Sequence, residues 1–190
     1  MDFMEIFTLV TGVIYMVLEI RQKNLMWVVG ILTSLAAMWV FFRQGLYASF
    51  GLNTYYFITA FIGLWQWRRD GEKVADGAIH LNRISWKVVA VSTVVMLVGT
   101  ALLTWVMQIV ENPMSLLDSS VTVLSAIATW WLVKTYIQQW WLWIIADSLS
   151  VVLCMSQGLW WMSLLYVAYV AAAVVGLRHW KKYGEYIYNR

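Results

Sequence analysis

The pattern of apolar and polar positions divides the chain into seven long apolar segments separated by polar links. A helix that crosses a bilayer needs about 20 mostly apolar residues. The segments extend over about Phe7–Ile20, Leu25–Phe42, Leu46–Trp67, Val88–Val110, Leu116–Tyr136, Trp140–Ser156 and Leu159–Leu177. Because most links are only a few residues long, the pattern predicts seven transmembrane helices in which consecutive helices are antiparallel neighbours.

Composition also indicates a membrane protein. It is 62% hydrophobic and 12% charged, whereas a soluble domain carries about 25% charged residues. The net charge of +3 does not indicate nucleic-acid binding, because the basic residues lie at the ends of apolar segments. The N-terminal sequence lacks a basic region and a cleavage site, so the first segment is predicted to be a permanent helix. We predict an all-α integral membrane protein.

The distribution of lysine and arginine predicts its orientation, since cytoplasmic loops are enriched in both. With the N-terminus outside and the C-terminus inside, 12 of the 13 basic residues lie on the inner side. The exception is Arg43, after the second segment.

An internal repeat relates the first three segments to the last three. The matching pairs are Trp27–Ser34 with Trp143–Ser150 at an offset of 116, then, after a slip of three residues, Gln44–Tyr47 with Gln157–Trp160 and Gly63–Arg69 with Gly176–Lys182. Both triplets begin outside, so the repeat is parallel and an unpaired helix must lie between its copies. This alignment pairs Asp147 with Ile31, and Trp140 with Asn24.

The resulting organisation is three helices, one linking helix and three helices. Its predicted parts are a first repeat at 1–67, a cytosolic link at 68–87, the unpaired helix four at 88–114, a second repeat at 115–182 and a cytosolic tail at 183–190. Transporters built from such repeats bind substrate near the membrane midplane between the two halves.

The sixth segment contains the most informative chemistry. Trp140, Trp143 and Asp147 share one helix face at i, i+3 and i+7. An aspartate at that depth costs about 2.5–3.5 kcal/mol on insertion scales, so it is expected to face a protein interior and to have a function. A carboxylate next to aromatic faces suits a flat organic cation. The alternatives are a structural carboxylate, and tryptophans that lie at the membrane interface.

Further polar and aromatic positions complete the predicted lining. Asn53 and Tyr56 share a face of the third segment, Tyr166 and Tyr169 do so on the seventh, and Trp27 and Ser34 lie on the second. Each of these groups has an alternative role in bonding a neighbouring helix. Glu19 is expected to pair with Arg21 or Lys23 or to lie at the interface. His80 and His179 have no partner at ligand spacing, so no metal site is predicted.

These residues resemble the Pnu family of bacterial vitamin transporters over nearly the whole chain. The resemblance rests on Trp140-x-x-Trp143-x-x-x-Asp147, on Asp118-Ser-Ser-Val-Thr-Val-Leu-Ser125, on Gln157-Gly-Leu, on Leu46-Tyr-Ala-Ser49 and on Gly63-Leu-Trp-Gln-Trp67. In nicotinamide riboside carriers of the family, the tryptophan motif typically ends in asparagine and a glutamine tends to occupy the position of Asn53. The aspartate resembles the thiamine branch.

The resemblance implies a multi-pass protein of the bacterial inner membrane that carries thiamine, or alternatively nicotinamide riboside, by facilitated diffusion. A cytosolic vitamin kinase would be its functional partner, trapping the vitamin by phosphorylation. No cofactor is implied.

Other functions agree less well with the sequence. An intramembrane enzyme would need a nucleophile and base at membrane depth, but no histidine lies within a segment and Asp147 has no second acid at matching depth. A seven-helix receptor is disfavoured by the internal repeat. A sugar uniporter of similar plan is the nearest rival. The oligomeric state stays open, with a homo-oligomer among the alternatives.

Overall fold

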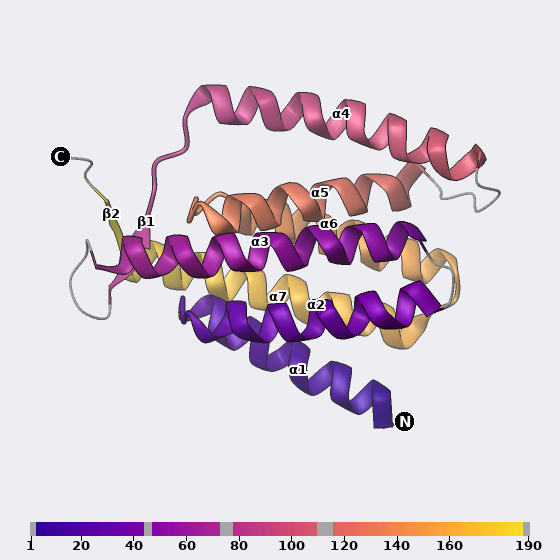
Figure 1. Ribbon diagram of the computed structural model, residues 1–190, viewed down its shortest axis with the longest axis horizontal. Coiled ribbons are helices and arrows are strands. Elements are labelled where there is room, and N and C mark those ends of the chain that lie inside the picture. The colour runs from indigo at the N-terminus through magenta and orange to yellow at the C-terminus, as the bar shows by residue number, and fades with distance from the viewer. Residues whose placement is uncertain (1–2, 44–46, 73–77, 110–115, 188–190) are drawn as a thin grey trace.

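A computed structural model describes residues 3–43, 47–72, 78–109 and 116–187. Within these ranges the chain forms seven helices and two short strands (Figure 1). The elements are α1 (Phe3–Ile20), α2 (Leu25–Arg43), α3 (Tyr47–Gly71), β1 (Ile79–Leu81), α4 (Trp86–Ile109), α5 (Leu116–Val133), α6 (Gln139–Ser156), α7 (Trp160–Tyr183) and β2 (Gly184–Tyr186). The predicted loop after α4 and part of the predicted link lie outside the described residues.

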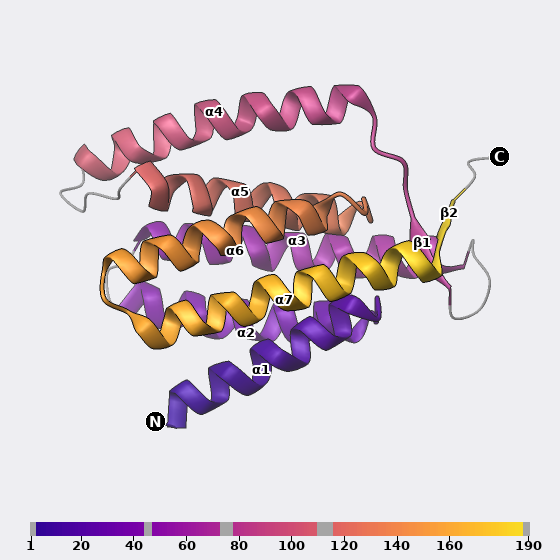
Figure 2. The same cartoon turned by 180° about the vertical axis from the view of Figure 1, so that it is seen from behind.

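Helix packing in the first three helices recurs in the last three. α2 packs on α3 as α6 packs on α7, and α1 packs on α2 as α5 packs on α6. The two sets meet where α3 contacts α5 and where α1 contacts α7. α4 packs on α5 and lies along the edge of the bundle in both views (Figures 1 and 2). A cavity between the two sets can therefore receive side chains from both.

The turn between α1 and α2 and the turn between α5 and α6 have the same hydrogen bonds, 113 positions apart in the sequence. Gln22 and Thr135 adopt positive φ angles of 50° and 54°. Their amide groups donate to the carbonyl groups of Glu19 and Leu132, each at 2.9 Å. Both turns therefore reverse the chain in the same way.

Gly63 and Gly176, which are also 113 positions apart, each pack against an indole ring. A Cβ atom at Gly63 would collide with the ring of Trp27, and one at Gly176 would collide with the ring of Trp140. Only glycine lets the helix backbone approach the ring this closely.

These contacts correct the sequence alignment between the two sets of helices. Asp147 corresponds to Ser34 and not to Ile31, and Trp140 corresponds to the tryptophan that covers Gly63 and not to Asn24. The alignment matched tryptophans by residue type in helices that contain several of them. The turn geometry fixes the register instead, without the slip of three residues.

Some helix ends differ from those that the apolar pattern predicts. α5 ends at Val133 rather than Tyr136, because Thr135 adopts a left-handed conformation that no helix interior accommodates. α7 continues past Leu177 to Tyr183, since basic residues in its last turn complement the helix dipole.

The two strands, which the apolar pattern does not predict, pair in parallel at one end of the bundle. The Gln22 side chain contacts both backbone groups of His80, accepting from its N–H at 2.8 Å and donating to its carbonyl at 2.9 Å. Asn82 donates through Nδ2 to the Thr135 hydroxyl at 3.0 Å. The segment at β1 is thus bonded to both chain-reversing turns.

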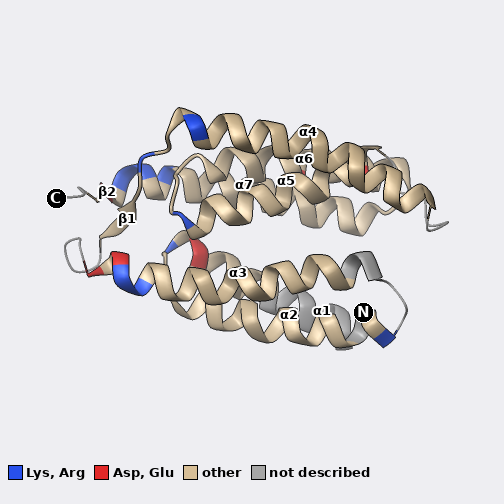
Figure 3. Cartoon of the chain, turned by 45° about the horizontal axis from the view of Figure 1, so that its top comes forward, with Lys and Arg blue, Asp and Glu red and all other residues tan. Residues whose placement is uncertain are grey.

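The outer surface of the bundle is apolar and its charges are concentrated at one end. Leu97, Trp105 and Val91 of α4 are more than half exposed. Among the described residues, α4, α5, α6 and α7 are long and apolar enough to cross a membrane. Figure 3 shows lysine and arginine gathered at the end that carries the strands, hereafter the strand end, while the helix shafts carry few charges. Such a surface suits lipid around the shafts.

Candidate functional site

A cavity of about 650 Å³ lies between the two sets of helices, within the usual range for small-molecule sites. All nine side chains that the sequence analysis selects line it: Trp27, Ser34, Asn53, Tyr56, Trp140, Trp143, Asp147, Tyr166 and Tyr169. They come from α2, α3, α6 and α7, and residues of α1 and α5 complete the wall. The structure thus brings the predicted residues together, and their contact with a ligand stays a prediction.

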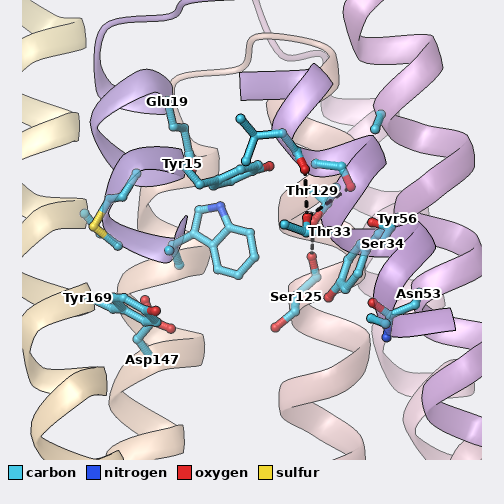
Figure 4. Close-up of a pocket in the computed structure, with 18 of the residues that line it drawn as sticks. Tyr15, Glu19, Thr33, Ser34, Asn53, Tyr56, Ser125, Thr129, Asp147 and Tyr169 are labelled. Atoms are coloured by element: carbon cyan, nitrogen blue, oxygen red, sulfur yellow. Dashed lines mark hydrogen bonds between the residues drawn. The ribbon is translucent and has the colours of Figure 1, made fainter. Parts of the chain in front are cut away.

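Asp147 and two tyrosines form one side of the cavity. Asp147 is 8% exposed, and Figure 4 shows it beside Tyr169. The Tyr169 ring packs edge-on against Tyr166, with ring centres 5.9 Å apart. Its hydroxyl lies so close to α1 that a Cβ atom at Gly12 would approach it to 2.9 Å. This side therefore offers a carboxylate beside aromatic rings.

Hydroxyl groups of three helices supply acceptors. Thr33, Thr129 and Ser150 each donate to a carbonyl group of their own helix at 2.9 Å. Since these protons are committed to the backbone, the oxygen lone pairs remain for a ligand. Figure 4 places Asn53 and Tyr56 on the far side of the cavity from Asp147. The cavity wall is consequently rich in hydrogen-bond acceptors.

Tryptophans close the cavity near the strand end. Trp27 packs edge-on against Trp67 at 5.0 Å, and Trp140 against Trp180 at 5.4 Å. Trp27 and Trp140 are 1% and 2% exposed, so their rings are fixed by packing. Trp143, which is only partly buried, has the ring face that is freer to stack on a ligand.

Glu19 is the main acidic residue of the cavity lining that sequence reasoning missed. It lines the cavity and is 6% exposed. Within the described residues no ion pair joins it to Arg21 or Lys23, and its carboxylate accepts from Gln139 Nε2 at 3.4 Å. The expected pairing is therefore wrong, because the last turn of α1 directs Glu19 into the bundle. The signal that could have found it is an acid inside an apolar segment, the same signal that selected Asp147.

The cavity lining holds acidic side chains and no described basic ones. Glu19 and Asp147 line it, and no lysine or arginine stands among the described lining residues. Buried carboxylates attract cations strongly, since charges interact more strongly away from bulk water. A phosphate group would be repelled at this site. The described lining therefore suits a cationic or neutral ligand with aromatic surface.

Comparison with known proteins places the chain in a family. The model of the family described as "Nicotinamide mononucleotide transporter" matches residues 2–182. The chain belongs to this family. Its members are transporters, not enzymes, so the chain is a multi-pass membrane protein that carries a small molecule, as the resemblance to the Pnu family predicted.

Two relatives of this chain are named as transporters of vitamins. The nicotinamide riboside transporter PnuC of Escherichia coli (strain K12) is 28% identical over 165 residues, which cover 74% of this chain and 69% of PnuC. The riboflavin/roseoflavin transporter RibM of Streptomyces davaonensis is 24% identical over 175 residues, covering 90% of this chain and 81% of RibM.

A solved structure supports the fold. The crystal structure of the vitamin B3 transporter PnuC matches with a TM-score of 0.70 and 22% identity, over 92% of this chain and 79% of that one. None of these three proteins is named for thiamine. The comparisons therefore favour nicotinamide riboside over the thiamine that the sequence analysis placed first.

Proposed function

We propose that this transporter carries nicotinamide riboside by facilitated diffusion across the inner membrane of a bacterium, with a cytosolic kinase trapping the vitamin by phosphorylation. The observation that carries the proposal is the cavity itself, whose described lining combines two acidic side chains and aromatic rings with no basic residue. The 28% identical relative named for this vitamin supports the choice.

The pyridinium ring of the substrate fits the side of the cavity that holds Asp147. Its positive charge would pair with the carboxylate, and its flat faces would contact Trp143 or the tyrosines. Asn53, on the opposite side, can bond the carboxamide through its own amide group. Asp147 would thus contact the ring charge, the aromatic side chains the ring faces, and Asn53 the carboxamide.

The charge of the cavity predicts that the transporter rejects phosphorylated substrate. Nicotinamide mononucleotide differs from the riboside by one phosphate, which would meet two carboxylates and no described lysine or arginine. We expect the mononucleotide to bind at least tenfold more weakly than the riboside. Quenching of tryptophan fluorescence in purified protein measures both affinities. Equal affinities would contradict the charge argument and the trapping step, since a phosphorylated product could then leave.

Thiamine is the second candidate, favoured by Asp147 at the position where nicotinamide riboside carriers typically have asparagine. Thiamine also carries a flat cation, and its affinity can be measured by the same fluorescence quenching. Tighter binding of thiamine than of the riboside would restore the first sequence-based choice. Binding of sugars alone would favour the uniporter of similar plan.

We further propose the arrangement of three, one and three helices with the N-terminus outside and the C-terminus inside. The recurrence of helix contacts and of turns at a spacing of 113 supports a parallel repeat, with α4 between its copies. The concentration of basic residues at the strand end supports a cytosolic position for that end.

Cysteine labelling tests this orientation. Arg43 and Lys87 are exposed at opposite ends of the bundle, and Cys154 can be replaced by serine to leave a single reporter. We expect Arg43→Cys to react with a membrane-impermeant maleimide in intact cells, and Lys87→Cys to react only after permeabilisation. The reverse pattern would invert the topology.

A further inference from the structure

Glu19 marks a part of the cavity that the pyridinium site does not use. Figure 4 shows Glu19 beyond Tyr15, on the side of the cavity away from Asp147. It lies in the last turn of α1, close to the strand end. The two acidic side chains therefore stand at separate places in the cavity lining.

Several hydrogen-bonding groups, on residues that line the cavity and on the Gln139 that contacts Glu19, are buried without partners. The indole N–H groups of Trp27, Trp140 and Trp143, all of which line the cavity, have no acceptor, and Gln139 Oε1 has no donor. Gln139 is fully buried and donates to Glu19. Buried polar groups are almost always paired in folded proteins. Unpaired donors and a buried acid in the lining of one cavity therefore indicate a polar partner there, which the hydroxyl groups of a ligand can supply.

The chemistry of these groups specifies the ligand. A carboxylate accepts hydrogen bonds, and an indole N–H only donates. A hydroxyl group satisfies both, because it donates its proton and accepts through its lone pairs. Two neighbouring hydroxyls match the two carboxylate oxygens of Glu19. The pyridinium ring itself offers no acceptor to the indoles, and its carboxamide is placed at Asn53, so this region suits a sugar.

We propose that Glu19, held by Gln139, is the specificity-determining residue for the hydroxylated part of the substrate. The proposal rests on the proposed function, because it takes the flat cation to lie at Asp147. It divides the cavity into a ring site and a sugar site. Glu19 would thus distinguish a riboside from the same ring without its sugar.

Two ligands that share one ring separate these sites. Nicotinamide riboside and 1-methylnicotinamide carry the same charged ring, but only the first carries a sugar. We expect wild-type protein to bind the riboside at least tenfold more tightly. Glu19→Gln is expected to weaken riboside binding about ten- to hundredfold, the range for a hydrogen bond to a charged group. The same substitution is expected to leave the binding of 1-methylnicotinamide unchanged.

Controls give each outcome a meaning. Asp147→Asn is expected to weaken both ligands alike, and Glu19→Asp is expected to give a riboside affinity between those of wild type and Glu19→Gln. The sugar site is overturned if Glu19→Gln weakens the binding of both ligands equally, or weakens neither. It is also overturned if wild-type protein binds the two ligands with equal affinity. The wild-type comparison decides even where a variant does not fold. If wild-type protein binds neither of the two cations, the proposed function and the sugar site are overturned together.

Discussion

Replacing Asp147 with asparagine is expected to weaken the binding of nicotinamide riboside by about 1.5–3 kcal/mol, the range for a lost charge-assisted interaction. The substitution keeps the size of the side chain and removes its charge. The effect should be large because Asp147 is 8% exposed, so water screens its attraction to the pyridinium ring only weakly. Equilibrium binding by tryptophan fluorescence, with uptake into proteoliposomes, measures the loss.

Ser148 provides the matched control on the same helix. It is exposed and its hydroxyl donates to the Ile144 carbonyl at 2.6 Å, so Ser148→Ala changes α6 without touching the cavity. We expect this variant to bind like the wild type. An Asp147→Asn variant that binds with wild-type affinity would show that the charge is not needed, as in the carriers whose motif typically ends in asparagine. It would assign recognition to Asn53 and the aromatic residues.

Replacing Gly176 with alanine is expected to lower the free energy of unfolding by about 1–3 kcal/mol, the usual cost of overpacking. The new Cβ atom would collide with the indole of Trp140, which cannot move aside because it is buried and packs edge-on against Trp180. In an exposed helix position the same substitution stabilises by up to about 1 kcal/mol. The collision therefore reverses the usual sign, and thermal unfolding in detergent detects it.

Gly51 is the control for this prediction. It lies in α3, is exposed, and a Cβ atom there would meet nothing within 4 Å. We expect Gly51→Ala to unfold at or slightly above the wild-type temperature. If Gly176→Ala matched it, the close approach of α7 to Trp140 would not hold the bundle together. Gly63→Ala should behave like Gly176→Ala, since Trp27 covers it in the same way.

Local pattern was sufficient for the helices and for nine of the residues that line the cavity. A span needs only an apolar run of adequate length, and a polar residue within such a run stands out against it. Asp147, Asn53 and the tyrosines of α7 were found in this way, and each lines the cavity. The substrate was less accessible, because one aspartate suits two vitamins whose cationic rings are alike.

Tertiary packing decided the remaining features. Glu19 lies near a helix end next to basic residues, where sequence favours an exposed ion pair, and only the packing of α1 against its neighbours turns the carboxylate inward. The register between the two sets of helices depended on Thr135 and Gln22, whose positive φ angles no residue preference predicts. Apolar content thus determined which segments become helices, because burying or embedding them needs only composition. Contacts between segments distant in sequence determined which side chains share the cavity.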